Sequence, residues 1–282
     1  MIDTFMHEGC PAILDAAGVV RKLGAIPASP LLTSPFPLFE DAVPLLTDEQ
    51  LRAFCAGKPK AGRHRFGDDW IKDQGQYGSC NGFASASALE RARVRRGLPR
   101  VKLSGASVYS CVNGGRDNGS IPEDAMRSMQ SRGAVPEDRG PPSKIYPSQY
   151  TAADWVEGAR FKAGECYTTR SRQALYTGLA LGYDGVIAVM AGNQFMRLNA
   201  QGIAGGDSGP GNHAVLVDDL DVLGDGTLVM DFANSWNLTY GHRGRAYLTY
   251  ERHCAQPAGY FAFYLIRSTA DDPSGDNPPM AG

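Results

Sequence analysis

The sequence predicts an α+β fold in which helices come first and a largely antiparallel sheet follows. Two patterns lead to this prediction: helical periodicity with stop signals in the first half, and short apolar runs between turn residues in the second. The 282 residues include 34 glycines and 18 prolines, a share above the usual value of about 12%, which favours a loop-rich architecture over a helical bundle. With 43% hydrophobic and 21% charged residues, the composition excludes a wholly disordered chain and a fibrous one.

The first 66 residues are predicted to form a proline-rich extension. Prolines recur between residues 27 and 44, and they exclude long helices there. The spacing of apolar residues predicts two short helices, over residues 12–23 and 48–55, and Thr47 fits the N-cap of the second. We expect the extension to pack along a larger body that follows it.

Three helices are predicted in the next part of the chain, each with start or stop signals of its own. In the first, alanines recur at every fourth residue, and Gly97 marks the end. In the second, Ser120 and Glu123 fit a capping box, and Gly133 fits the C-terminal stop. The arginines between 91 and 100 are expected to be a solvated helix end. The helices are expected at residues 80–97, 121–132 and 172–181.

Five short apolar runs between glycines and polar turns predict the strands of the sheet. They are expected at residues 186–191, 213–217, 228–232, 246–250 and 260–266. A ligand is expected to bind in the cleft between the helical half and the sheet half. Residues 269–282 combine prolines with aspartates and are predicted to be disordered.

Charge and targeting signals narrow the class of protein. A net charge of -2 gives no electrostatic reason to expect binding to nucleic acid or to an anionic membrane. The N-terminus lacks a basic region and a long apolar run, so no secretory signal is expected, and no apolar run is long enough for a membrane-spanning helix. We therefore expect a cytoplasmic or virion-associated protein rather than a secreted one.

The segment from Asp73 to Phe83 holds the most specific chemical signal. A glycine-rich turn there delivers Cys80 to the first turn of a predicted helix, where unpaired backbone N–H groups and the helix dipole favour a thiolate. A free cysteine is more often a small buried hydrophobic residue. We expect that commoner role for four others: Cys10, Cys55, Cys166 and Cys254.

A thiolate nucleophile needs a neighbouring base and a third group that orients the base. His213 begins an apolar strand directly after a glycine-rich loop, and Asn234 ends the next strand. Trp236 follows two residues later and is expected to shield an Asn–His hydrogen bond from water. Gln74, six residues before Cys80, is expected to aim its amide N–H at an oxyanion. The other four histidines are expected to be satisfied core or surface residues.

These strings resemble the papain-like cysteine peptidases. The residues that match are Asp73 to Cys80, Asn212 to Val215, and Asn234 to Trp236 with Gly241 and Gly244 after them. His213 follows Cys80 by 133 residues, within the roughly 130 to 150 residues expected for that family. The resemblance implies a two-lobed domain over residues 67–268, with the active-site cleft between the lobes. Its helical lobe is expected at about 67–160 and its antiparallel, β-barrel-like lobe at about 161–268, between the extension 1–66 and the tail 269–282.

The resemblance implies hydrolysis of peptide bonds in a polypeptide substrate. It assigns Cys80 as nucleophile, His213 as general base and then acid, Asn234 as the orienting residue, and Gln74 as oxyanion donor. It further implies a set of substrate-binding residues: Gly78, Ser79, Asn81, Asn212 and Trp236. No metal or organic cofactor is required. Residues 1–66 are a candidate binding segment for a protein partner.

The chain departs from the family pattern at several positions. Tyr77 replaces the cysteine that forms a disulfide in secreted members, and Asn81 replaces the aromatic residue after the nucleophile. Asn237 and Tyr240 stand where Gly and Trp are common. The extension lacks a recognisable charged helical inhibitory pro-segment, so the chain is interpreted as a divergent member.

Three alternatives remain open from the sequence. The chain is an active peptidase, or it is an inactive papain-fold module with a structural or binding role in a larger bacterial or phage assembly. A third alternative is a hydrolase of the NlpC type or a transglutaminase, which the Gln and Asn-Ser-Trp strings disfavour. Asp218, Asp219 and Asp221 could hold a metal, but we predict a solvated strand end there.

Overall fold

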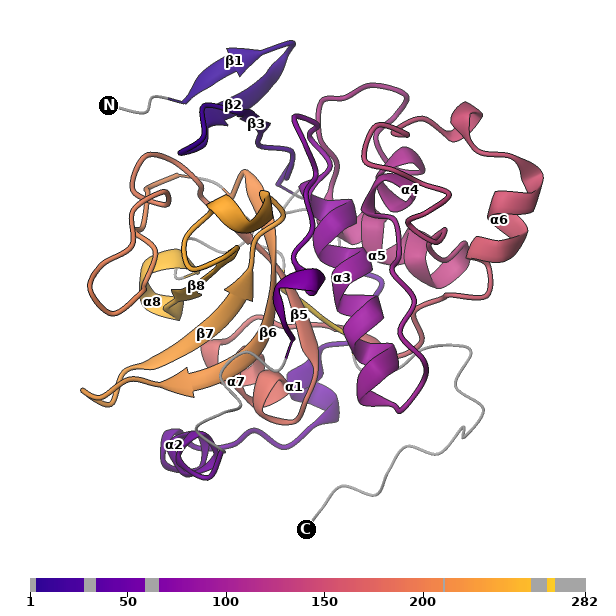
Figure 1. Ribbon diagram of the computed structural model, residues 1–282. Coiled ribbons are helices and arrows are strands. Elements are labelled where there is room, and N and C mark those ends of the chain that lie inside the picture. The colour runs from indigo at the N-terminus through magenta and orange to yellow at the C-terminus, as the bar shows by residue number, and fades with distance from the viewer. Residues whose placement is uncertain (1–3, 28–33, 59–65, 210, 255–262, 267–282) are drawn as a thin grey trace.

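The computed structural model describes residues 4–27, 34–58, 66–209, 211–254 and 263–266. Helices dominate the lobe on the right of Figure 1, and an antiparallel sheet dominates the lobe on the left. The predicted α+β fold with two lobes is therefore confirmed. The predicted disordered tail lies outside the described residues.

The helical lobe is built around α3 (Cys80–Arg95), which is buried along most of its length. Small side chains on α3 let its neighbours come close: a Cβ at Gly82 would overlap the backbone of α4 (Gly105–Ser110). α5 (Pro122–Ser131) packs against the same helix, and α6 (Ala152–Gly158) lies farther out (Figure 1). The helix predicted from residue 80 is confirmed.

α5 begins in a different way from the one predicted. Ser120 and Glu123 do not form a capping box; the N-cap is Ile121, which makes no side-chain cap, and a proline occupies the first helical position. Proline there removes an N–H that would otherwise need a partner. The end of the helix is as predicted, since Gly133 follows it with a left-handed φ of 84°.

The second lobe is built on a six-stranded antiparallel sheet that is open rather than a closed barrel. In spatial order its strands are β4 (Cys166–Thr168), β9 (Phe263–Ile266), β5 (Asp184–Val189), β6 (His213–Val222), β7 (Leu228–Ala233) and β8 (Arg245–Leu248). All five predicted strands are present, with shifted bounds; of the last prediction, residues 260–262 lie outside the described ranges. The three-residue β4 was missed because so short a strand has no readable alternation.

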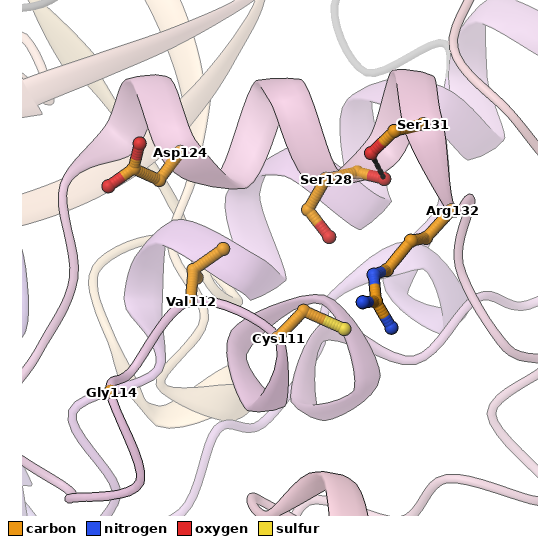
Figure 2. A pocket seen from close by; sticks show the side chains of 7 residues that line it. All are labelled: Cys111, Val112, Gly114, Asp124, Ser128, Ser131 and Arg132. Carbon is orange, nitrogen blue, oxygen red and sulfur yellow. Dashed lines mark hydrogen bonds between the residues drawn. The ribbon is translucent and has the colours of Figure 1, made fainter.

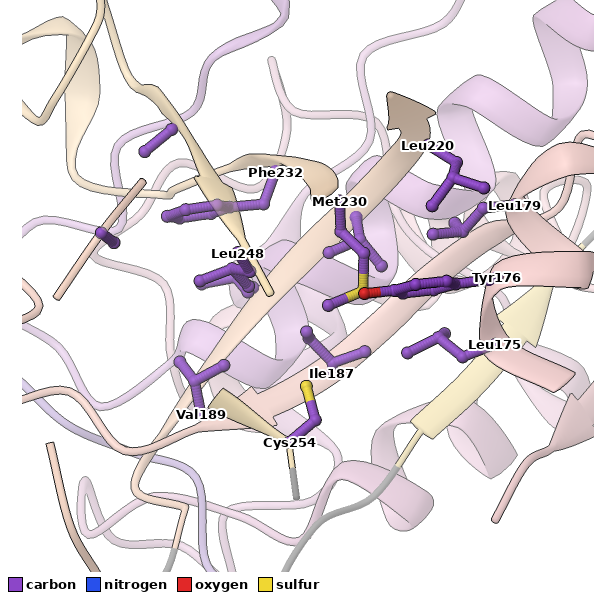
Figure 3. Packing of buried hydrophobic residues seen from close by; sticks show 14 of the residues in the cluster. Leu175, Tyr176, Leu179, Ile187, Val189, Leu220, Met230, Phe232, Leu248 and Cys254 are labelled. Carbon is purple, nitrogen blue, oxygen red and sulfur yellow. The ribbon is translucent and has the colours of Figure 1, made fainter. Parts of the chain in front are cut away.

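A hydrophobic core lies between this sheet and α7 (Arg172–Ala180), which confirms the third predicted helix (Figure 3). Tyr176 and Leu179 of the helix belong to the same buried cluster as Ile187 and Met230 of the sheet. This core fixes the sheet independently of the helical lobe. The opposite face of the sheet is therefore free to pack against α3 and form the junction between the lobes.

The start of the extension forms a small sheet instead of the helix predicted at 12–23. Its antiparallel strands are β1 (Phe5–His7), β2 (Cys10–Leu14) and β3 (Val20–Lys22). The turn between the last two strands overrides the helical pattern: the Asp15 carboxylate accepts hydrogen bonds from the N–H groups of Ala17 and Val19, both at 2.9 Å. Gly18 has a left-handed φ of 75°. This is the local bonding by which Asp competes with helix formation.

The helices within residues 34–58 of the extension pack on the sheet lobe. The predicted helix at 48–55 is confirmed as α2 (Asp48–Ala56), and Thr47 forms a capping box with Gln50. The remaining short helices are α1 (Phe39–Ala42), α8 (Tyr250–His253) and single 3₁₀ turns at Asp68–Trp70, Pro147–Gln149 and Asn237–Thr239. In the described ranges, no helix combines the length and the apolar character needed to cross a membrane.

The arginine cluster and the aspartates of the sheet correct two predictions. Arg91 is fully buried and pairs with Asp218, so this part of α3 is not a solvated helix end. Arg245 pairs with the same Asp218 and with Asp231. Asp218 is only 3% exposed, so it is not a solvated strand end either. These charges hold α3 to the sheet because each buried charge has a partner.

Candidate active site

Cys80 begins α3 at the junction between the two lobes. It follows a glycine-rich turn, as the sequence predicts, and it is fully buried. Burial raises the pKa of its thiol to about 12, although hydrogen bonds from the backbone at Ala214 and Gly24 act in the opposite direction. The Ala214 contact brings the start of β6 to the thiol. The Gly24 contact comes from the N-terminal extension.

His213 and Asn234 meet across β6 and β7. The Nε2 atom of His213 lies 2.8 Å from Oδ1 of Asn234, so Nε2 carries the proton and Nδ1 is the basic nitrogen. Nδ1 is buried and has no hydrogen-bond partner within the described ranges. The Trp236 ring stacks on the imidazole with centroids 4.4 Å apart. Burial lowers the pKa of His213 to about 4, and the hydrogen bond to Asn234 acts the other way.

Gln74 is fixed at the same junction by contacts on both sides of its amide. Its Oε1 accepts a hydrogen bond of 2.6 Å from the Ser235 hydroxyl, which directs the NH₂ group away from that strand end. The Nε2 atom donates to the carbonyl oxygen of Tyr77 at 2.7 Å and to that of Lys22 at 3.4 Å. The amide thus donates to the turn before Cys80 and to the extension.

The residues that the resemblance assigns to substrate binding have different surroundings. Asn81 is fully buried, and its Nδ2 donates to the backbone and hydroxyl oxygens of Ser120. Ser79 is buried with its hydroxyl unpartnered in the described part of the chain. Asn212 exchanges side-chain hydrogen bonds with Ala191. Asn81 and Asn212 therefore hold neighbouring backbone in place, Asn81 at Ser120 and Asn212 at Ala191.

Residues 22–26 of the extension run through the cleft, an arrangement that the sequence did not predict. The Gly24 carbonyl accepts from the N–H of Ser120 at 2.8 Å, and Ile26 N–H donates to the Ser120 carbonyl at 2.9 Å. Ala25 N–H donates to the Asn212 carbonyl at 2.9 Å. A Cβ at Gly24 would overlap the carbonyl oxygen of Gly78. The extension binds the cleft by its backbone, and only glycine fits at its closest approach.

Two buried cations anchor this segment. The Lys22 ammonium pairs with Asp117 at 2.8 Å and with Glu8 at 2.9 Å. Asp117 also accepts from the N–H of Gly78 and from the hydroxyl of Tyr109. One carboxylate thus connects the extension to the turn before Cys80.

Arg21 forms the second anchor. Its guanidinium pairs with Asp15 at 2.9 Å within the extension and with Asp73 across the cleft, and it donates to the Gly75 carbonyl at 3.1 Å. Sequence reasoning missed Ser120, Asp117 and both anchors. The residues at 117–119 predict a turn, and this was the available signal. No local pattern indicates that a segment about ninety residues earlier in the chain binds to that turn.

No group of three or more His, Cys, Asp or Glu side chains within the described ranges could hold a metal ion. The aspartates considered as ligands are engaged elsewhere: Asp218 with two arginines and Asp219 with Lys58. His253 is buried and bonded to backbone atoms through both ring nitrogens, as expected for a core histidine.

Comparison with known proteins points to a single family. The sequence model described as papain family cysteine protease matches residues 68–260. Vignain from Vigna mungo is 25% identical over 217 residues, which cover 73% of this chain and 58% of vignain. A cathepsin L-like peptidase from Aedes aegypti is 25% identical over 193 residues, 65% of this chain and 57% of that protein. The chain thus spans less than two thirds of the length of these relatives.

Solved structures show the same fold. Xylellain, a cysteine protease from Xylella fastidiosa, superposes with a TM-score of 0.66 at 19% identity, covering 87% of this chain and 95% of that one. The Amb a 11 cysteine protease, a ragweed pollen allergen solved in its proform, superposes with a TM-score of 0.59 at 22% identity. The superposition covers 70% of this chain and 61% of that one. The papain-like two-lobed fold is confirmed. The matches come from plants, insects and bacteria, so a bacterial or phage origin stays a prediction.

Proposed function

Because the chain belongs to the papain family of cysteine proteases, we propose that it is a cysteine peptidase that hydrolyses peptide bonds in polypeptides. The observation that supports this most directly is the pair His213 and Asn234. Their 2.8 Å hydrogen bond leaves the basic nitrogen of the imidazole unpartnered within the described ranges. The backbone of the next residue, Ala214, lies close enough to the Cys80 thiol to lower its pKa. A base is thus held in one tautomer beside a nucleophile at a helix start.

The proposed reaction uses four side chains. His213 Nδ1 takes the proton of the Cys80 thiol, and the sulfur attacks the carbonyl carbon of the scissile bond. Gln74 Nε2 and the Cys80 N–H, which has no intrahelical partner at the first helical position, stabilise the oxyanion. His213 then gives its proton to the departing amine, and water attacks the thioester with His213 again as base. Asn234 keeps the ring oriented throughout.

In this structure the cleft is occupied by the extension, so we propose that it is the latent form of the enzyme. The Lys22 carbonyl lies where Gln74 would donate to a substrate carbonyl, 3.4 Å from Nε2. Burial keeps Cys80 and His213 neutral, with pKa values of about 12 and about 4. Departure of the segment would let water in and remove the burial that disfavours the thiolate–imidazolium pair.

The first test is removal of the nucleophile. Cys80→Ala should lower kcat/KM on casein or a dipeptide reporter by about 10⁴-fold or more, and an epoxide thiol-protease inhibitor should label Cys80 once the extension has left the cleft, as in the Gly24→Ala variant. The matched control is Cys111→Ala, which should keep activity because Cys111 lies outside the cleft. If inhibitor adducts are absent from Cys80 and Cys80→Ala keeps its activity, the assignment is wrong.

The second test opens the cleft. Gly24→Ala places a Cβ against the Gly78 carbonyl, so the extension should no longer dock and kcat/KM should rise by about tenfold or more, a shift of at least 1.4 kcal/mol in the docking equilibrium. Gly224→Ala is the control because a Cβ there meets nothing within 4 Å. Equal activity of Gly24→Ala and the parent would contradict the latent form.

The occupied cleft also favours a second candidate function, a binding module without catalysis. In that case Cys80→Ala would leave the biological role intact, and opening the cleft with Gly24→Ala would produce no turnover of any peptide reporter.

A further inference from the structure

An open pocket of about 420 Å³ lies in the helical lobe, between the end of α4 and one face of α5. Figure 2 shows the side chains that surround it. They belong to Cys111, Val112, Gly114, Asp124, Ser128, Ser131 and Arg132. None of these residues takes part in the candidate active site, so the pocket is a separate feature of the fold.

The pocket contains the accessible thiol of the chain. All six cysteines lie in described ranges and are free, and five of them are buried, Cys80 included. Cys111 alone is partly exposed. It caps the C-terminal end of α4, and its sulfur lies 3.9 Å from the Ser110 hydroxyl. A reagent in solution therefore reaches Cys111 while the extension still covers the nucleophile.

A buried hydroxyl without a partner points into the same pocket. Ser128 is only 6% exposed, and its Oγ has no hydrogen-bond partner in the described part of the chain. Figure 2 shows this hydroxyl directed from α5 toward the space beside Cys111. A buried polar group left unpaired loses the hydrogen bonds that it would make to water, which disfavours that arrangement. A ligand carbonyl in the pocket would accept its hydrogen bond and remove that loss.

Opposite charges stand at the two ends of the pocket. Arg132 is exposed and forms no ion pair with any residue of the described ranges, and its guanidinium reaches toward the Cys111 sulfur (Figure 2). Asp124 lies at the other end of α5, eight residues earlier, which is about 12 Å along a helix. An extended peptide of three residues spans about 10 Å. The spacing therefore suits a short peptide with a carboxylate at one end and an ammonium at the other.

We propose that Cys111 is a modification site that forms a mixed disulfide with a small cysteinyl peptide. The co-reactant is the disulfide form of that peptide. Cys111 loses its proton to solvent, and its thiolate attacks one sulfur; the peptide S–S bond breaks as the Cys111 S–S bond forms. The second peptide leaves as a thiolate and takes a proton from solvent. Arg132 binds the carboxylate, Asp124 the ammonium, and Ser128 a peptide carbonyl.

The experiment compares three disulfides on the full-length chain: oxidised glutathione, which has carboxylates and ammonium groups, cationic cystamine, and uncharged bis(2-hydroxyethyl) disulfide. The adduct at Cys111 is followed by quenching and peptide mass spectrometry. Each rate is divided by the rate for the same chain unfolded in urea, which cancels the intrinsic reactivity of the reagent. A charge-assisted contact predicts that this ratio is about tenfold higher for oxidised glutathione than for cystamine.

Two variants identify the groups responsible. Arg132→Gln should remove the preference for oxidised glutathione, whereas Arg197→Gln, an exposed arginine of the other lobe, should keep it. Ser128→Ala should lower the ratio by about threefold, as expected for one neutral hydrogen bond. Equal ratios for the three reagents, adducts mainly at another cysteine, or an unchanged preference in Arg132→Gln would each overturn the proposal. The reagent comparison itself needs no variant, and it does not depend on peptidase activity.

Discussion

Two groups of ion pairs cross the molecule, and they differ in how far their carboxylates are removed from water. At the junction of the lobes, Arg91 of α3 and Arg245 of the sheet share Asp218, whose side chain is 2% exposed. Between the extension and the cleft, the Lys22 ammonium is just as buried, but the side chain of its partner Asp117 is 13% exposed. Glu8, the second partner of Lys22, belongs to the extension itself, and its side chain is 72% exposed.

This difference separates permanent contacts from reversible ones. When both charges of a pair are buried and one is removed, the other remains in a medium of low polarity without compensation. When the extension leaves the cleft, Glu8 leaves together with Lys22, and both Lys22 and the Asp117 carboxylate that it bound become hydrated. The interlobe pairs therefore hold the fold together, whereas the pairs of the extension hold a conformation that can open.

The largest effect is expected at the interlobe group. Asp218→Asn keeps the side-chain volume but leaves Arg91 and Arg245 without their shared charge, so the free energy of unfolding should fall by about 3–5 kcal/mol. Denaturant unfolding followed by circular dichroism measures this change. Asp225→Asn, at an exposed turn, should change it by less than about 0.5 kcal/mol. Similar small changes in both variants would remove the distinction between the two groups.

A smaller effect of another kind is expected at the extension. Asp117→Asn keeps an oxygen to accept from Gly78 and Tyr109 but removes the charge that binds Lys22. Loss of one charge-assisted contact should increase the open population, and with it kcat/KM, by about tenfold. The free energy of unfolding should fall far less than in Asp218→Asn. Unchanged activity with strong destabilisation would mean that Asp117 belongs with the permanent contacts.

The residues of the proposed site could be predicted because each has a local signature. Cys80 follows a glycine-rich turn at a helix start, His213 starts a strand after a loop, and Asn234 ends a strand before a tryptophan. Turn residues, helix caps and hydrophobic periodicity determine where such helices and strands begin and end, and all of them act over only a few residues. The spacing between the strings then identified the fold.

The contacts that close the cleft could not be predicted because they depend on residues far apart in the chain. Lys22 and Asp117 are separated by 95 positions, and Arg21 and Asp73 by 52. The helix predicted at 12–23 was wrong because Asp15 bonds the turn and because β2 pairs with two neighbouring strands. Backbone pairing and charge satisfaction at long range leave little trace in local patterns.

The smallest expected effect is the pH dependence of docking, which the ion pairs of the extension should cause and the interlobe pairs should not. The Lys22 ammonium lowers the pKa of Glu8, but both residues belong to the extension, so this pair does not depend on docking. Burial would raise the pKa of Asp73, but the N–H of Gly75 and the Arg21 guanidinium outweigh burial and lower it. Because Arg21 belongs to the extension and Asp73 does not, the lowered pKa of Asp73 means that this carboxylate stabilises docking above its ordinary pKa of about 4. The contribution is lost as the pH falls through the docked value.

The Lys22 ammonium sets the upper pH limit of docking. Burial alone would lower its pKa, but the hydrogen bonds to Asp117 and Glu8 outweigh burial and raise it. Its contribution is therefore complete below the ordinary pKa of about 10.4 and is lost as the pH rises through the docked value. Docking should be strongest between roughly pH 5 and pH 10 and should weaken on both sides.

Hydrogen exchange of the Ala25 and Ile26 amides, which donate to carbonyls of the cleft, measures docking directly. After correction for intrinsic exchange rates, their protection should fall by about threefold from pH 6 to pH 3.5, a modest change because the carboxylates concerned are partly screened by water. The amide of Leu89 in buried α3 should keep its protection over the same range. If the three amides lose protection together, the extension is part of the folded core and not a reversible cover. If the protection of Ala25 and Ile26 does not change with pH, carboxylate anchors are not what holds the segment in the cleft, and its backbone hydrogen bonds to Ser120 and Asn212 must do so instead.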